Sequence, residues 1–145
     1  MFKLITTLAL FVATVVSGQT SFEKDIIITN DSYLISIIFS NLLSNAIKYS
    51  QENGIIFVNL EKENNHIVCK IIDNGIGISK EDLEKIGSRF YRSQKVEHAE
   101  IKGTGLGLSI VADCARLLGG LAEIIDVSYA DVCIQVRLPL VEDAV

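Results

Sequence analysis

The chain has 145 residues, of which 49% are apolar, and a formal net charge of −5. This length suits one domain with a buried core, and the acidic balance argues against a nucleic-acid binder. The three cysteines, Cys69, Cys114 and Cys133, are widely spaced and form no metal-ligand pattern, so we expect buried thiols in a reducing compartment.

Residues 1–20 form an apolar N-terminal segment, and we assign residues 21–145 to one domain. Lys3 precedes an apolar stretch over residues 4–16 and small residues near a possible cleavage point, which is the shape of a secretory signal. The stretch is short for a transmembrane helix. Three interpretations stay open: a signal or tether, a strand or helix of the domain, and an artefact of gene boundaries. Membrane association is therefore expected only through residues 1–18.

The next part of the chain predicts a short strand over residues 25–29 and then a long helix. Asp31 and Ser32 are residue types that cap helix N-termini. The helix is expected to run to about Ser50, and residues 51–54 provide its stop.

The rest of the chain mixes hairpins with helices. The predicted elements are strands at 55–60 and 67–73, a short helix opened by Ser79, a mobile loop over 88–102, a helix over 105–118 ended by two glycines, and a hairpin of strands at 121–127 and 132–138. This order predicts an α+β two-layer sandwich, with one mixed, mostly antiparallel sheet and helices on a single face.

Three polar residues share one face of the first long helix. Asn41, Asn45 and Lys48 follow the i, i+4, i+7 pattern. The alternative is a solvated face, although such a face usually carries more charge. Taken alone the stripe favours this alternative, and only together with the other motifs does it favour a binding role. The amide oxygens of Asn45 and Asn41 suit Mg²⁺, and Lys48 suits phosphate charge. Tyr49 is suited either to lie against an adenine or to fill the core.

Asp73 ends a strand of buried type, where a carboxylate is costly unless something pairs with it. The exocyclic amine of adenine is a suitable donor. Gly75 and Gly77 let the backbone turn and approach a base without a side-chain clash, and Ile78 follows them. The alternative is a plain β-turn, because Asp-Asn-Gly is a common turn sequence.

A glycine-rich segment precedes and opens the second long helix. Free backbone N–H groups at a helix start suit phosphate, whereas an inert flexible connector would not carry leucines between its glycines. Arg92 could reach a γ-phosphate from the preceding loop. The predicted phosphate-binding residues of the segment are Lys102, Gly103, Thr104, Gly105, Leu106, Gly107 and Leu108.

The motifs at residues 41–49, 73–77, 89–92 and 103–108 together resemble the catalytic, ATP-binding domain of sensor histidine kinases, in the superfamily of gyrase, a heat-shock chaperone and MutL. The resemblance covers about residues 32–139. It implies a Bergerat-type ATP-binding fold, ATP and Mg²⁺ as cofactors, and transfer of the γ-phosphate to a histidine. It also implies a dimerisation and phosphoacceptor domain in trans, a response regulator as indirect partner, and a cytoplasmic ATP-binding domain; the signal-like segment leaves tethering or export open.

Departures from the family pattern narrow the function. Asn41 stands where the ATP-hydrolysing relatives place a general-base Glu, one helical turn before the metal-binding Asn, and an amide cannot take a proton from water. This favours phosphoryl transfer over hydrolysis. His66 and His98 lack the sequence that follows a phosphoacceptor histidine, so the acceptor is expected elsewhere. The alternative is a non-catalytic nucleotide-binding regulatory module, or a stand-alone fragment without an acceptor.

Overall fold

The computed structural model describes residues 19–22, 30–50, 54–93, 103–128 and 131–140. Its longest element is helix α2, Ser32–Tyr49, as the sequence predicts. The Asp31 carboxylate caps it by accepting hydrogen bonds from the backbone N–H groups of Tyr33 (2.9 Å) and Leu34 (3.1 Å). One face of α2 is apolar and buried, and its centre is formed by Ile35, Ile38, Phe39, Leu42 and Leu43.

The strands form one sheet in the order β1-β2-β3-β5-β4. Their bounds are β1 Gln19–Phe22, β2 Ile56–Glu63, β3 His66–Asp73, β4 Leu121–Ser128 and β5 Asp131–Pro139. β1 pairs parallel to β2, and the other neighbours pair antiparallel. The predicted mixed, mostly antiparallel sheet is therefore confirmed.

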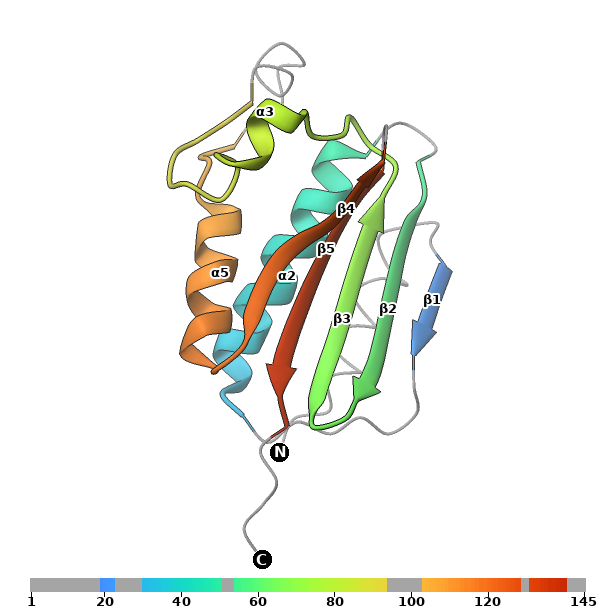
Figure 1. Cartoon of the computed structure of the whole chain (residues 1–145), viewed down its shortest axis with the longest axis vertical. Coiled ribbons are helices and arrows are strands. Elements are labelled where there is room, and N and C mark those ends of the chain that lie inside the picture. The colour runs from blue at the N-terminus through green and yellow to red at the C-terminus, as the bar shows by residue number, and fades with distance from the viewer. Residues whose placement is uncertain (1–18, 23–29, 51–53, 94–102, 129–130, 141–145) are drawn as a thin grey trace, which may run out of the picture.

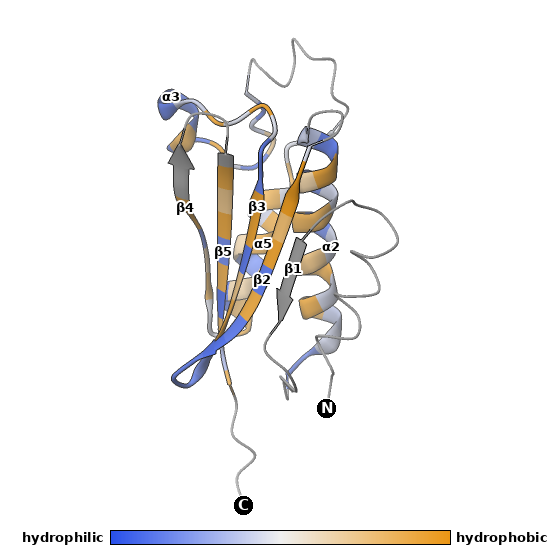
Figure 2. Cartoon of the chain, turned by 90° about the vertical axis from the view of Figure 1, so that its right-hand side faces the viewer, coloured by the Kyte–Doolittle hydropathy of each residue, from blue (hydrophilic) through white to orange (hydrophobic). Residues whose placement is uncertain are grey.

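Two helices cover one face of this sheet, which confirms the two-layer architecture (Figure 1). They are α2 and α5, Gly107–Leu117, and they pack side by side. The core lies between the layers, where apolar residues of the strands meet those of α2, and the side of α2 turned away from the sheet is paler or blue in Figure 2. In β5 the predicted alternation holds, because Val132, Ile134, Val136 and Leu138 all belong to this core.

Several element boundaries differ from the prediction. β2 and β3 continue beyond residue 60 and before residue 67 to a tight turn at Asn64, where φ is 52°. The antiparallel pairing of β2 with β3 continues through these residues to Glu63 opposite His66. Two ion pairs lie along this part of the sheet, Lys70 with Glu61 and Arg137 with Glu63. The second long helix begins at Gly107 rather than Gly105, because Gly105 has a φ of 74°, outside the helical region.

Strand β1 was not predicted. The strand predicted at residues 25–29, the signal-like stretch at residues 4–16 and most of the predicted loop, residues 94–102, lie outside the described residues. β1 crosses the boundary that we placed after residue 20, and the division into two segments stays a prediction. Among the helices of the described ranges, none combines the length and the hydropathy that a membrane span requires.

The three cysteines are free and buried, as predicted. Burial raises the pKa of the Cys69 thiol, with a smaller contribution from Cys133. Burial also raises the pKa of Cys114, and the adjacent Asp113 adds to the effect. A raised pKa keeps both side chains as protonated thiols, which are poor nucleophiles and poor metal ligands.

Candidate functional site

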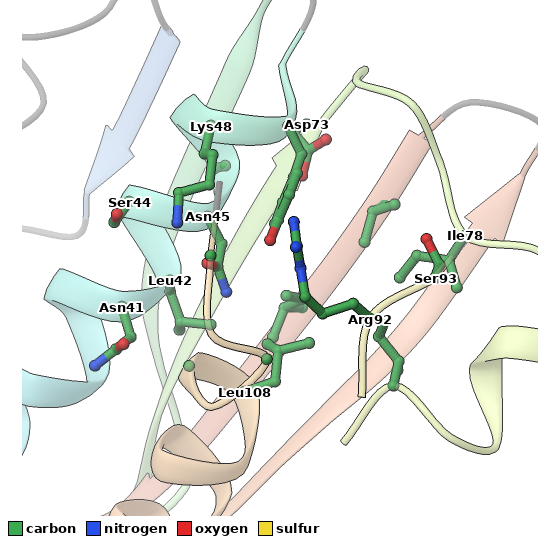
Figure 3. Close-up of a pocket in the computed structure, with 18 of the residues that line it drawn as sticks. Asn41, Leu42, Ser44, Asn45, Lys48, Asp73, Ile78, Arg92, Ser93 and Leu108 are labelled. Carbon is green, nitrogen blue, oxygen red and sulfur yellow. The ribbon is translucent and has the colours of Figure 1, made fainter. Parts of the chain in front are cut away.

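A cavity of about 180 Å³ opens between α2, the inner face of β3 and β5, and the start of α5 (Figure 3). Because a water molecule occupies about 30 Å³ in the liquid, this space suits a guest larger than one ordered water. Most of the predicted site residues line it together: Asn41, Asn45, Lys48, Tyr49, Asp73, Gly77, Ile78, Arg92, Gly103, Thr104, Gly105, Gly107 and Leu108.

Helix α2 presents its two amides and its lysine to the cavity, as the spacing predicts (Figure 3). The Asn41 Nδ2 group donates to the Ile37 carbonyl at 2.8 Å, which fixes that amide against its own helix. Gly107 lies against both amides: a Cβ there would stand 3.4 Å from Asn41 Oδ1 and 3.4 Å from Asn45 Nδ2. The start of α5 therefore meets α2 at the two asparagines.

Asp73 stands at the end of β3 and is only 8% exposed. Its Oδ1 atom accepts a hydrogen bond from the Gly75 N–H at 3.0 Å. A Cβ on Gly75 would lie 1.9 Å from the Tyr49 carbonyl oxygen, and the next N–H, of Ile76, donates to that oxygen at 3.1 Å. Gly75 is therefore required for a close approach of this loop to the end of α2, and Gly77 has a φ of 73° that favours glycine.

The start of α5, with Gly107 and Leu108, lines the cavity. The first N–H groups of an α-helix have no partner within it, and the helix dipole is positive at this end. Gly107 begins a helix of 11 residues, long enough for this effect, and the side chain at the N-cap position, Leu106, accepts no hydrogen bond. Gly103 brings the preceding segment close to the lysine, since a Cβ there would lie 3.5 Å from Lys48 Nζ.

Arg92 enters the cavity from the side opposite α2, and its guanidinium extends toward the space between Asn45 and Asp73 (Figure 3). The segment that carries it is joined to the glycine-rich segment, because the Phe90 N–H donates to the Gly105 carbonyl at 3.0 Å. A Cβ on Gly105 would lie 2.7 Å from the Phe90 carbonyl carbon. The two segments therefore approach each other at a point where only glycine fits.

Two predicted residues fall outside the lining, and a third is not described. Gly75 and Leu106 do not line the cavity, and Lys102 lies outside the described residues. The prediction missed ten further lining residues, most of which are apolar. They are Leu42, Ser44, Ala46, Ile71, Ile76, Ile86, Tyr91, Ser93, Val132 and Ile134. Strand alternation could have indicated Ile71, which shares the face of Asp73, and Ile134, its partner across the strands.

The lining combines two kinds of chemistry. Lys48, Arg92 and the start of α5 offer positive charge and N–H donors, which suit an anion such as a phosphate chain. Asp73 offers an acceptor beside apolar strand residues, which suits a flat heterocycle with an amino group. The Asn45 amide, which also lines the cavity, fits Mg²⁺, which usually keeps waters and phosphate oxygens as its other ligands.

Comparison with known proteins agrees with this geometry. A family model described as "Histidine kinase-, DNA gyrase B-, and HSP90-like ATPase" matches residues 30–142. The sensor histidine kinase WalK of Bacillus subtilis is 36% identical over 100 residues, which cover 68% of this chain and 16% of WalK. The sensor histidine kinase GlrK of Escherichia coli is 33% identical over 106 residues, which cover 73% of this chain and 22% of GlrK.

Solved structures show the same fold. The mycobacterial sensor histidine kinase MprB superposes with a TM-score of 0.77 at 25% identity, covering 94% of this chain and 91% of that one. The catalytic domain of the histidine kinase ThkA, in a nucleotide-free form, gives a TM-score of 0.73 at 24% identity, covering 94% of this chain and 88% of that one, a likeness of fold alone. The chain thus spans most of the MprB and ThkA chains but a small part of the WalK and GlrK relatives.

Proposed function

This chain belongs to the family of histidine kinase-, DNA gyrase B-, and HSP90-like ATPases, as an ATP-binding catalytic domain of the histidine kinase type, and we propose that it binds Mg²⁺-ATP and transfers the γ-phosphate to a histidine on another domain or chain. The observation that carries the proposal is that Lys48, Arg92 and the start of α5 line the same cavity as the buried Asp73.

Different residues of the cavity bind different parts of the nucleotide. Asp73 accepts a hydrogen bond from the adenine amino group, and the neighbouring apolar wall holds the ring. Lys48 and the backbone N–H groups of the glycine-rich segment hold the phosphates. Asn45, with Asn41 beside it, holds Mg²⁺, which when bound neutralises charge on the phosphate oxygens. Arg92 approaches the terminal phosphate and stabilises charge that spreads over it during transfer.

Transfer breaks the bond between the γ-phosphorus and the oxygen that bridges it to the β-phosphate, and forms a bond from the γ-phosphorus to a histidine nitrogen. The bridging oxygen keeps the electron pair and leaves with ADP. The domain contributes position and charge, as in other phosphoryl transfers. Asn41 offers no base for activating water, so the proposal includes slow hydrolysis of ATP when no acceptor is present.

The partners follow from this reaction. A dimerisation domain that bears the phosphoacceptor histidine receives the phosphate, and a response regulator takes it from there. The relatives WalK and GlrK are both named sensor histidine kinases, which supports a place for this chain in two-component signalling. The ATP-binding domain then works where ATP is available, in the cytoplasm.

A transfer assay tests the proposal. The full chain is mixed with γ-labelled ATP, Mg²⁺ and a separately expressed dimerisation domain from a related kinase. We expect acid-labile label on the histidine of that domain and none when its histidine is replaced by glutamine. Nucleotide binding without transfer to any dimerisation domain would instead support a non-catalytic regulatory module, and rapid hydrolysis without an acceptor would contradict the kinase assignment.

A further inference from the structure

Asp82, outside the cavity, bonds two different parts of the molecule. It lies in the first turn of the short helix α3, Lys80–Leu83, whose N-cap is Ser79. Its Oδ2 atom accepts a hydrogen bond from the Ser79 hydroxyl at 2.7 Å, and its backbone N–H donates to that hydroxyl at 3.2 Å. This arrangement is a variant of the capping box, in which the carboxylate bonds to the N-cap hydroxyl instead of the N-cap backbone N–H. It uses the Oδ2 atom of the Asp82 carboxylate, and the Oδ1 atom takes no part in it.

The other oxygen, Oδ1, accepts a hydrogen bond from the phenol of Tyr91. Tyr91 is half-buried and lines the cavity, and it directly precedes Arg92. A capping box needs only one of the two carboxylate oxygens, so the cap does not account for this second bond. A hydrogen bond to a charged acceptor is among the stronger ones in proteins, so it holds the Tyr91 side chain in one place.

The backbone that leads to Tyr91 is also held. The Tyr91 N–H donates to the Ser88 carbonyl at 3.3 Å, and Phe90 has a φ of 64°, a left-handed conformation that a bulky residue rarely adopts. Just before it, Arg89 forms an ion pair with Asp113 of α5 at 2.9 Å. Residues 89–91 are thus held by these contacts, and Arg92 follows them directly and lines the cavity.

From these contacts we propose that Asp82 and Tyr91 are positioning residues that hold Arg92 in the nucleotide cavity, an inference that rests on the proposed transfer of phosphate. Arg92 has a long side chain with many rotamers, and its reach to a phosphate depends on where its backbone begins. Asp82 fixes that starting point through the phenol without touching the nucleotide. Its effect therefore falls on transfer rather than on nucleotide binding.

The first test removes only the hydroxyl, with Tyr91→Phe in the full chain. We expect the affinity for Mg²⁺-ATP to stay within about twofold, because the adenine and metal contacts remain. The single-turnover rate of transfer to a dimerisation domain should fall by roughly ten- to a hundredfold, because a misplacement of about 1 Å can cost up to about a hundredfold. Asp82→Asn keeps an oxygen for the Ser79 hydroxyl. It should likewise leave the affinity for Mg²⁺-ATP nearly unchanged and slow the transfer. Tyr33→Phe is the matched control, since Tyr33 is 72% exposed on α2 outside the cavity lining.

A double-mutant cycle shows whether the effect passes through Arg92. In an Arg92→Ala background, Tyr91→Phe should cause no further loss of transfer, because the group that it positions is gone. The same further loss in both backgrounds would overturn the proposal, as would a Tyr91→Phe variant that transfers at the wild-type rate.

A second readout needs neither nucleotide nor acceptor. The Nε–Hε NMR signal of Arg92, assigned by its disappearance in Arg92→Ala, should move or broaden in Tyr91→Phe and stay unchanged in Tyr33→Phe. An unchanged signal in Tyr91→Phe overturns the positioning role even where transfer is reduced. A wild type that binds no nucleotide overturns the proposed function instead, and this NMR comparison then still decides whether Tyr91 positions Arg92.

Discussion

Asn45 is the side chain that we expect to determine whether the cavity binds Mg²⁺. It lies one helical turn from Asn41 and one turn from Lys48, and it faces the start of α5 at Gly107. A neutral amide adds no charge to a site that already holds Lys48 and Arg92. Its oxygen can ligate a hard cation while the phosphates supply the negative charge.

Asn45→Ala should therefore remove the effect of Mg²⁺ on ATP binding. We expect the affinity for ATP with Mg²⁺ to fall at least about tenfold, because even residues that only support a metal ligand are worth about ten- to a hundredfold in metal affinity. Titration calorimetry with Mg²⁺ and with a chelator measures this. Asn65→Ala, at the exposed tip of the β2–β3 hairpin, is the control. Equal affinity of wild type and Asn45→Ala with Mg²⁺ present would rule out Asn45 as the ligand.

Asp73→Asn tests the choice of base. The new amide keeps an oxygen for the Gly75 N–H, so the loop should hold its shape, but the negative charge is lost and half of the side chain becomes a donor. ATP binding should weaken by roughly tenfold, the loss of a charge-assisted hydrogen bond. Competition of ATP and GTP for a fluorescent nucleotide measures it. Equal competition by the two nucleotides in the wild type would contradict a role for Asp73 in reading adenine.

The sequence predicted the polar residues of the cavity better than its apolar ones. Asn41, Asn45 and Lys48 stood out because a helix places them on one face, and Asp73 because a carboxylate is unusual at the end of a buried strand. Ile71 and Ile134 look like any core residue of a strand, and only the pairing of β3 with β5 brings them to the cavity.

At the level of elements, the periodic segments were predictable and the aperiodic ones were not. Helix α2 has a cap and an apolar face, and the antiparallel hairpins have apolar alternation and local turns. β1 has only four residues and pairs parallel with β2, far along the chain. Neither its length nor its partner leaves a local pattern. The start of α5 was placed too early because the left-handed Gly105 depends on a contact with Phe90.

The loop after β3 gives a prediction at this scale. Gly75→Ala should destabilise the fold by roughly 1–3 kcal/mol, the usual cost of an added methyl without space, because its Cβ would lie 1.9 Å from the Tyr49 carbonyl oxygen. It should also weaken nucleotide binding, since the same loop carries Gly77 and Ile78 into the cavity. Urea denaturation measures the free energy of unfolding.

Gly87 provides the matched control, because a Cβ there meets nothing within 4 Å and its φ is not positive. Gly87→Ala should be neutral or slightly stabilising, by at most about 1 kcal/mol. Equal stability of Gly75→Ala and Gly87→Ala would mean that the loop can move away from the end of α2, and the close approach would then not explain the glycine.

For the whole molecule, the cavity lies between the two layers, so a ligand there contacts both. The lining comes from α2 and α5 on one side and from β3 and β5 on the other. These surfaces meet only in the folded chain, because the residues that form them lie between Asn41 and Ile134 in the sequence. A nucleotide that binds here should therefore stabilise the native state and leave the unfolded chain unaffected.

Thermal unfolding with nucleotide follows from this arrangement. Mg²⁺-ATP at a hundred times its Kd adds about 2.7 kcal/mol to the free energy of unfolding, which for a chain of 145 residues corresponds to a rise in Tm on the order of 10 °C. GTP at the same concentration should give a much smaller rise, because Asp73 offers no donor to its keto group. In Asn45→Ala the rise should no longer depend on Mg²⁺, whereas Asn65→Ala should behave as the wild type. A Tm that ignores saturating Mg²⁺-ATP would mean that the nucleotide does not join the two layers, and the cavity would then not be its site.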